Sequence, residues 1–160
     1  MVVNETHTFR GTWLMYALLM LELPTLILIV VLWQTDHLGD EGPIAVAVVA
    51  GVMTATFMLI INIKLELRVD DRGLAYRFSP FNFKWKKIPA DQIKSIKVKK
   101  TDGLFEYGGI GYRISYKQRA YIFMADHVIE LETPERKYIF STKRPTEVEE
   151  IIQSSEKGNY

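Results

Sequence analysis

Two long apolar runs, separated by a short polar connector, fill most of the first 63 residues. Thr12–Trp33 carries a single formal charge, Glu22, and Pro43–Ile63 carries none. A helix of about 20 apolar residues crosses the hydrocarbon core of a bilayer. A backbone in lipid must be helical or belong to a closed barrel, which two segments cannot form. The pattern predicts a transmembrane helical hairpin over residues 1–63, with spans of about 12–33 and 43–63.

Short segments with strand periodicity replace the apolar runs from Lys64 onwards. Leu65, Leu67 and Val69 alternate with charged residues, which is the period-two pattern of a half-buried strand. Pro145, followed by apolar residues at helical spacing, predicts a C-terminal helix over 145–155. Residues 64–160 are therefore predicted to form a small, mainly-β domain of about seven antiparallel strands and a C-terminal α-helix. The segments that carry strand periodicity after the first one are 74–79, 83–88, 96–99, 112–116, 119–124, 128–133 and 137–142.

This order of strands and helix is that of a pleckstrin-homology-like (PH-like) β-barrel. Residues 66–153 resemble the bacterial PH-like domains found behind one or two transmembrane helices in small uncharacterised membrane proteins. That family often has Trp where Ile110 stands and a smaller aliphatic residue where Tyr112 stands. The resemblance implies a bacterial membrane protein with a non-enzymatic binding domain. The stretches that carry it are Tyr76–Pro89, Ile93–Lys100, Glu106–Arg113 and Phe140–Pro145.

The charges divide unevenly along the chain and predict an orientation. Residues 1–63 hold one basic and five acidic residues, a net charge of −4, whereas residues 64–160 hold 19 basic and 14 acidic residues, a net charge of +5. The connector Gln34–Gly42 has no Lys or Arg, while Arg10 precedes the first span and Lys64 follows the second. Because cytoplasmic flanks collect Lys and Arg, we expect an integral protein of the bacterial cytoplasmic membrane, with both termini and the β-domain in the cytoplasm.

Two features of the predicted spans are candidates for helix packing. Glu22 and Pro24 lie near the middle of the first span, where a carboxylate is energetically expensive. In one interpretation Glu22 belongs to a proton relay or makes a polar contact with a partner helix. In the other, which we favour, Glu22 is protonated and hydrogen-bonded inside the hairpin, with Thr54, Thr56 or Asn62 as its partner. Small residues at four-residue spacing in the second span let another helix approach closely. We expect this face to pack against the first span, with a homo-oligomer seam as the alternative; its residues are Ala47, Gly51 and Ala55.

Basic residues of the β-domain are the candidates for binding an anionic lipid headgroup or a protein partner. A solvated sheet face is the plainer interpretation, and a net charge of +5 is modest for nucleic acid, which we do not expect as a partner. The glycine-rich stretch Gly108–Gly111 either forms a loop or bulge or cradles a phosphate. The candidate binding residues are Lys84, Lys86, Lys97, Lys99, Lys100, Arg113 and Arg119.

Residue types that carry chemistry are sparse. The absence of cysteine excludes disulfides, thiolate catalysis and Cys-ligated zinc. His7, His37 and His127 lie in three separate regions, so we expect no metal site, no cofactor and no enzymatic activity. The sequence favours a membrane-anchored PH-like interaction module that binds a protein partner or anionic lipid at the cytoplasmic face. The alternative is an accessory or regulatory subunit of a larger membrane complex, which contacts partner helices through its hairpin.

Overall fold

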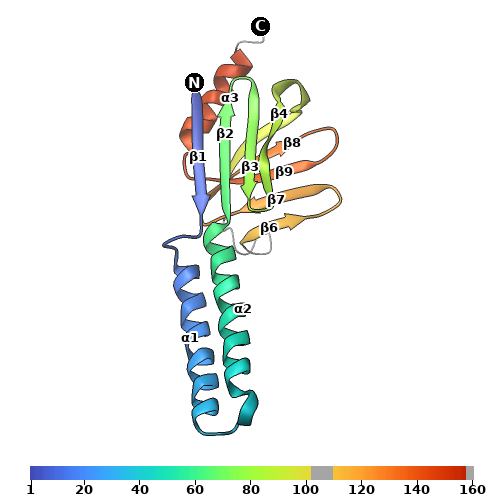
Figure 1. The fold of residues 1–160 in the computed structure, drawn as a ribbon. Helices are drawn as coiled ribbons and strands as arrows, with labels where there is room; N and C mark the ends of the chain where they lie inside the picture. The colour runs from blue at the N-terminus through green and yellow to red at the C-terminus, as the bar shows by residue number, and fades with distance from the viewer. Residues whose placement is uncertain (102–109, 158–160) are drawn as a thin grey trace. The chain divides into compact units, whose positions relative to one another are not determined.

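The computed structural model describes residues 1–101 and 110–157, with side chains up to Ser154 (Figure 1). The chain divides into two compact units. A helical unit contains Phe9–Ile63, and a β unit contains Met1–Thr8 together with the chain from Lys64 onwards.

The helical unit is an antiparallel pair of long helices, α1 (Trp13–Gln34) and α2 (Gly42–Asn62), joined through a short 3-10 turn at Gly39–Glu41 (Figure 1). At 1.5 Å per residue the helices are about 33 Å and 31 Å long, close to the thickness of a hydrocarbon core, about 30 Å. Both are long and apolar enough to cross a membrane. The expectation of two long apolar helices in this part of the chain is confirmed.

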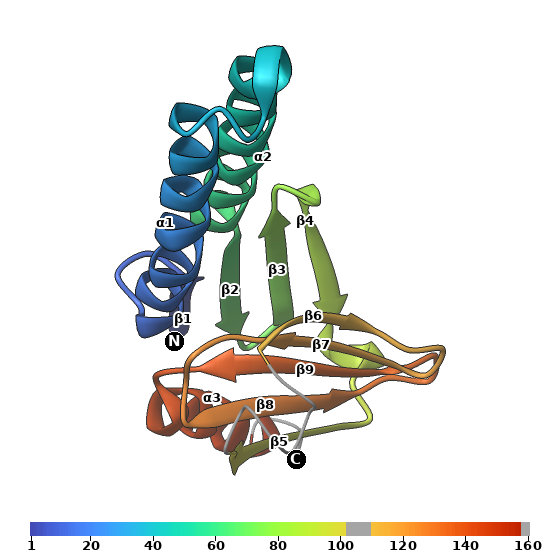
Figure 2. The ribbon, with the colours of Figure 1, turned by 90° about the horizontal axis from the view of Figure 1, so that it is seen from below.

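The β unit contains two sheets and a C-terminal helix. The first sheet has the strand order β1-β2-β3-β4 and the second the order β5-β8-β9-β7-β6. The strands of the second sheet run across those of the first (Figure 2). The first sheet consists of β1 (Val2–Thr8), β2 (Lys64–Asp70), β3 (Gly73–Ser79) and β4 (Asn82–Pro89). The second consists of β5 (Ser95–Lys100), β6 (Gly111–Ile114), β7 (Gln118–Ile122), β8 (His127–Glu132) and β9 (Lys137–Thr142), and α3 (Pro145–Lys157) follows it.

The expected strand segments and the C-terminal helix are confirmed, but the expectation of antiparallel pairing throughout is wrong. β7 and β9 pair in parallel, with Arg119 beside Tyr138. The cause is the strand order: the chain passes from β7 beyond the position of β9 to form β8, then returns between them as β9. Neither sheet closes on itself within the described residues, so the PH-like barrel stays a prediction.

The sequence pattern does not predict strand β1, so the expectation that residues 1–8 belong to the hairpin is wrong. β1 pairs antiparallel with β2 along its whole length, from Val2 opposite Asp70 to Thr8 opposite Lys64. The side chains of Val3, Glu5 and His7 point inward and are almost fully buried. Because Glu5 and His7 are polar, the alternation of apolar residues that marks a half-buried strand does not occur here. Residues 1–8 belong to the β unit rather than to the hairpin.

Aromatic side chains fill the space between the two sheets. Tyr76 and Phe78 of β3 meet Tyr121 of β7 and Phe140 of β9. The rings of Tyr121 and Phe140 stack with centroids 5.2 Å apart, and Tyr76 lies 4.9 Å from Phe140. Such pairs add about 0.5–1.5 kcal/mol each beyond the area that they bury. The core is therefore continuous from one sheet to the other.

The register of β1 predicts that the hairpin can be removed without unfolding the β unit. Since Thr8 and Lys64 are direct cross-strand partners, a two-residue Asn-Gly turn can replace Phe9–Ile63 and close the β1–β2 pair. We expect this variant to show β-type circular dichroism and one cooperative thermal transition.

The matched control is residues 64–160 alone, which lack β1. It loses the buried Val3 side chain and uncovers the inner edge of β2, so its free energy of unfolding should be lower by about 2 kcal/mol or more. Equal stability of the two proteins would contradict the assignment of β1 to the β unit.

Candidate functional site

β4 is the most exposed strand of the β unit and the last strand of the first sheet. Aromatic and basic residues alternate at its start, and the side chains from Phe83 to Lys87 are all exposed. Phe83 keeps 69% of its surface accessible and Trp85 keeps 44%. The outer edge of β4 pairs with no other strand among the residues that the structure describes. This strand therefore presents both side chains and backbone groups to its surroundings.

The outer face of the first sheet holds Trp85 in place. The guanidinium of Arg77 lies over the indole ring at 5.2 Å from its centroid. Arg77 also forms an ion pair with Glu66. A second ion pair joins Glu66 to Lys64, whose Nζ lies 2.6 Å from the carboxylate. A cation–π contact at an exposed site is worth about 0.5–1 kcal/mol, so these charges fix the orientation of the indole without covering it.

The structure separates the predicted lysine cluster into two groups on different sheets. Lys84, Lys86 and Lys87 lie on β4 and make no ion pair with any described residue. On β5, Nζ of Lys99 pairs with Glu130 at 3.3 Å.

Lys97 and Lys99 of β5 share a face of the sheet with Glu130. Lys97 stands directly opposite Glu130 in the register of β5 and β8. Glu130 also forms an ion pair with Lys137, whose Nζ lies 2.8 Å from its carboxylate. Lys100 is the last residue of β5. Acidic neighbours therefore partly neutralise β5, whereas the lysines of β4 have no ion-pair partner within the described part of the chain.

Arg113 and Arg119 do not flank a common site. In the register of β6 and β7, Arg113 stands opposite Ala120 and Arg119 opposite Ile114, so the two arginines project from opposite faces of the second sheet. Burial by itself would lower the pKa of Arg119, but the phenol groups of Tyr112, Tyr121 and Tyr76 outweigh this effect and raise it. Arg119 thus belongs to the aromatic core.

Of the predicted glycine-rich stretch, only Ile110 and Gly111 are among the described residues. Gly111 has a φ of +125°, a backbone conformation that favours glycine. Gly111 begins strand β6 opposite Ile122, so the loop or bulge expected for the whole stretch stays a prediction. Gly108 and Gly109 lie outside the described residues, so the phosphate cradle stays untested.

Glu22 faces a small cavity between α1 and α2, which Thr54 and Phe57 also line. The other two expected partners are engaged elsewhere: the hydroxyl of Thr56 donates to the carbonyl of Val52, and the side-chain amide of Asn62 donates to the carbonyl of Met58. Thr54 is therefore the expected partner that lies beside Glu22. Pro24 lies inside α1, and the helix continues through it.

The small-residue face of α2 points away from α1, so the expectation that it packs inside the hairpin is wrong. Ala47, Gly51 and Ala55 are exposed, and a Cβ at Gly51 would meet no atom within 4 Å. The residues of α2 that line the cavity beside α1 include Ala50 and Met53. Spacing alone showed that the small residues share a face but not which neighbour that face meets. The homo-oligomer alternative stays a prediction.

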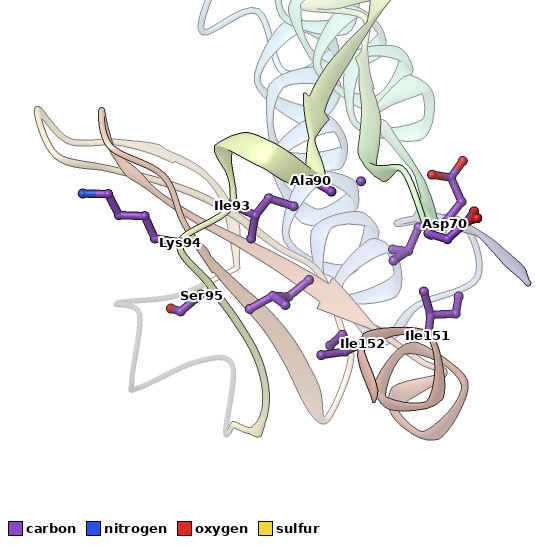
Figure 3. A pocket seen from close by; sticks show the side chains of 11 residues that line it. Asp70, Ala90, Ile93, Lys94, Ser95, Ile151 and Ile152 are labelled. Carbon is purple, nitrogen blue, oxygen red and sulfur yellow. The ribbon is translucent and has the colours of Figure 1, made fainter. Parts of the chain in front are cut away.

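A cavity of about 260 Å³ opens between the end of β2, the start of β5 and α3 (Figure 3). Ile93, Ile151 and Ile152 surround it, whereas the amine of Lys94 points away from them (Figure 3). Its lining is mainly apolar and brings together no group of acids and bases that could perform catalysis. Sequence reasoning did not find this cavity, because its walls come from distant parts of the chain.

Among the described residues of the β unit, Glu5 of β1 has the most deeply buried carboxylate. It accepts hydrogen bonds from Nε2 of His7 at 3.0 Å, from the hydroxyl of Thr142 at 2.5 Å and from the backbone N–H of Lys143 at 2.9 Å. Burial by itself would raise the pKa of Glu5, but these hydrogen bonds outweigh burial and hold it below its ordinary value. The carboxylate ties β1 to the end of β9.

These side chains do not form a nucleophile–histidine–acid triad. In such a triad the histidine stands between the hydroxyl and the carboxylate, whereas here Glu5 stands between Thr142 and His7. His7 and Thr142 are also almost completely buried. Among the described residues, no group of three or more His, Asp or Glu side chains could hold a metal ion.

Comparisons with models of known protein families, with characterised proteins and with solved structures find no match to this chain. The fold and the candidate site therefore define a general class: an apolar helical hairpin inserted between the first two strands of a two-sheet β unit with an exposed basic edge strand.

The environment of Glu5 predicts a stability that depends on pH. Because its folded-state pKa is depressed, the contribution of Glu5 is fully present above its ordinary pKa of 4.5 and is lost as the pH falls below this value. Glu5→Gln should lower the free energy of unfolding near neutral pH by about 1–3 kcal/mol, since its amide N–H groups would face buried donors.

Unfolding of the β unit closed by the Asn-Gly turn measures this effect, at neutral pH and at a pH below that of carboxyl titration. On acidification, the free energy of unfolding should fall more in the protein with the native Glu5 than in the Glu5→Gln variant. Glu149→Gln, on the exposed face of α3, should behave like the native protein. An equal loss in all three would contradict the role assigned to Glu5.

Proposed function

We propose that this protein is a membrane-anchored interaction module whose β unit binds anionic lipid headgroups through the lysines of β4. The carrying observation is the exposed edge strand, on which Lys84, Lys86 and Lys87 have no ion-pair partner among the described residues. Each lysine close to an anionic leaflet contributes about 1 kcal/mol. A tether to the same membrane makes the binding effectively intramolecular, so weak individual contacts are sufficient.

The pairing of β1 with β2 supports the membrane arrangement in this proposal. β1 ends at Thr8, just before the hairpin, and β2 begins at Lys64, just after it, and the two residues are cross-strand partners. If α1 and α2 span a bilayer, both of their connections to the β unit therefore lie on one side. From the bias of Lys and Arg we infer that this side is the cytoplasm, where anionic lipids are available, and from the family resemblance that the cell is bacterial. The PH-like barrel belongs to this proposal as the expected architecture of the β unit.

Lysine acylation of the full chain in lipid nanodiscs tests the proposal. Lys84, Lys86 and Lys87 should react severalfold more slowly in discs that contain anionic lipid than in zwitterionic discs, because the headgroups cover them. High salt should restore the rate, since it screens exposed charges. Peptide mass spectrometry reads each site separately, and exposed Lys97 on β5 is the internal control that should not change.

Equal rates in the two kinds of disc would contradict headgroup binding by β4. If Lys97 alone responded to anionic lipid, the binding surface would be β5. If no lysine responded, the alternative function would gain support, in which the hairpin serves a larger membrane complex. The small-residue face of α2, which lies outside the contact with α1, would then be the surface for a partner helix.

A further inference from the structure

Three large aromatic side chains lie exposed along the turn before β4 and the first half of that strand. They are Phe81 in the turn between β3 and β4, and Phe83 and Trp85 on β4, and we call them the aromatic rim. Their accessible fractions are 62%, 69% and 44%. Water-exposed aromatic surface of this kind marks a site of contact with a partner or a membrane. Phe83 lies on the edge strand β4, and its side chain is exposed.

The sheet register places the start of the aromatic rim, at Phe81 and Phe83, at the end of the sheet where the chain enters and leaves the helical hairpin. Thr8, Lys64 and Ser79 lie side by side at the ends of β1, β2 and β3. Asn82, the first residue of β4, pairs with Phe78, which is one residue further into the sheet than Ser79. Neighbouring strands are about 4.8 Å apart, so the turn at Phe81 is only about 10 Å from Lys64 across the sheet. Lys64 follows α2 after one residue, Ile63, and the length of α2, about 31 Å, matches the hydrocarbon core.

Two side chains of the aromatic rim, Phe81 and Trp85, contact other residues of the β unit. The ring of Phe81 stacks on Phe78 with centroids 5.5 Å apart and an interplanar angle of 16°, and Phe78 itself is buried in the core. Trp85 is held from the other side by the guanidinium of Arg77. A surface that is fixed before binding loses little conformational entropy when it docks.

The chemistry of the aromatic rim fits the interfacial region of a bilayer. Tryptophan and other amphipathic aromatic side chains concentrate at the level of the headgroups. Lys84 and Lys86 alternate with the aromatic residues, and long basic side chains can lay their apolar stems along the interface while their charges reach the phosphates. The segment from Phe81 to Lys86 therefore offers apolar side chains to the boundary between acyl chains and headgroups, and positive charges to the headgroups themselves.

We propose that the aromatic rim inserts into the interfacial region of the same bilayer that α1 and α2 span, and that it docks the β unit on the membrane surface. This proposal rests on the membrane anchoring in the proposed function, and it adds an apolar contact that does not require anionic lipid. The insertion fixes the depth and tilt of the β unit and brings the β4 lysines to the headgroups.

A fluorescent probe at the rim tests the insertion directly, because the chain has no cysteine and a single introduced cysteine is labelled alone. Phe83→Cys in the full chain is labelled with an environment-sensitive fluorophore and reconstituted into nanodiscs of zwitterionic lipid. The matched control is Asp71→Cys, which lies in the exposed turn between β2 and β3 at the opposite end of the same sheet. β3 spans about 20 Å between the two positions.

The probe at Phe83→Cys should emit at shorter wavelength than the probe at Asp71→Cys, and brominated lipid should quench it severalfold more strongly. A second measurement leaves the rim unchanged: in Trp13→Phe/Trp33→Phe, Trp85 is the one remaining tryptophan, and brominated lipid should quench its emission. Emission from Phe83→Cys equal to that from Asp71→Cys, with Trp85 open to a water-soluble quencher and untouched by brominated lipid, overturns the proposal.

The two proposals fail separately. One outcome is that brominated lipid quenches the probe while the acylation rates of the β4 lysines do not depend on lipid charge. This outcome supports insertion of the aromatic rim and contradicts headgroup binding by β4. Protection of the lysines in anionic discs, with the probe at Phe83→Cys still in water, supports headgroup binding and overturns insertion. If the aromatic rim binds a protein partner instead of lipid, the probe at Phe83→Cys also remains in water.

Discussion

The pairing of β1 with β2 is the constraint on which the rest of the structure depends. These two strands are adjacent in the first sheet, yet the whole helical unit lies between them in the chain. The hairpin is therefore an insertion in the turn of a β-hairpin, and its two ends must meet within one strand spacing, about 4.8 Å. Packing of α1 against α2 meets this requirement, as does the hydrogen bond from the guanidinium of Arg10 to the carbonyl of Ile61 at 3.2 Å.

A polar network holds β1 against the second sheet. Glu5 links β1 to Thr142 and to the backbone of Lys143, just before α3 begins. A buried carboxylate is tolerated only when donors surround it, and three donors do so here. The arrangement gives the N-terminal strand a specific register, because a slip by one residue would expose Glu5 and His7 and bury their neighbours. The fixed register in turn sets where the chain enters the hairpin.

The sequence predicted the elements whose side chains follow a simple period. Long apolar runs revealed the two helices, alternation revealed eight of the strands, and the spacing of Val148, Ile151 and Ile152 revealed α3. It did not reveal β1, because the inward positions of that strand carry Glu5 and His7. The parallel β7–β9 pair depends on the order in which distant strands assemble, which local periodicity does not contain. For the same reason the lysines of β4 and β5, which are close in sequence, lie on separate sheets.

The central claim is that both ends of the hairpin leave from one strand pair, so that the N-terminal strand and the rest of the β unit lie on the same side of the membrane. Labelling of single cysteines with a membrane-impermeant maleimide in sealed vesicles tests it most directly. Asn4→Cys on β1 and Asp71→Cys on the β2–β3 turn should react from the same side, and Asp40→Cys in the connector should react from the opposite side. Reaction of Asn4→Cys and Asp71→Cys from different sides, or of all three from one side, would contradict the account.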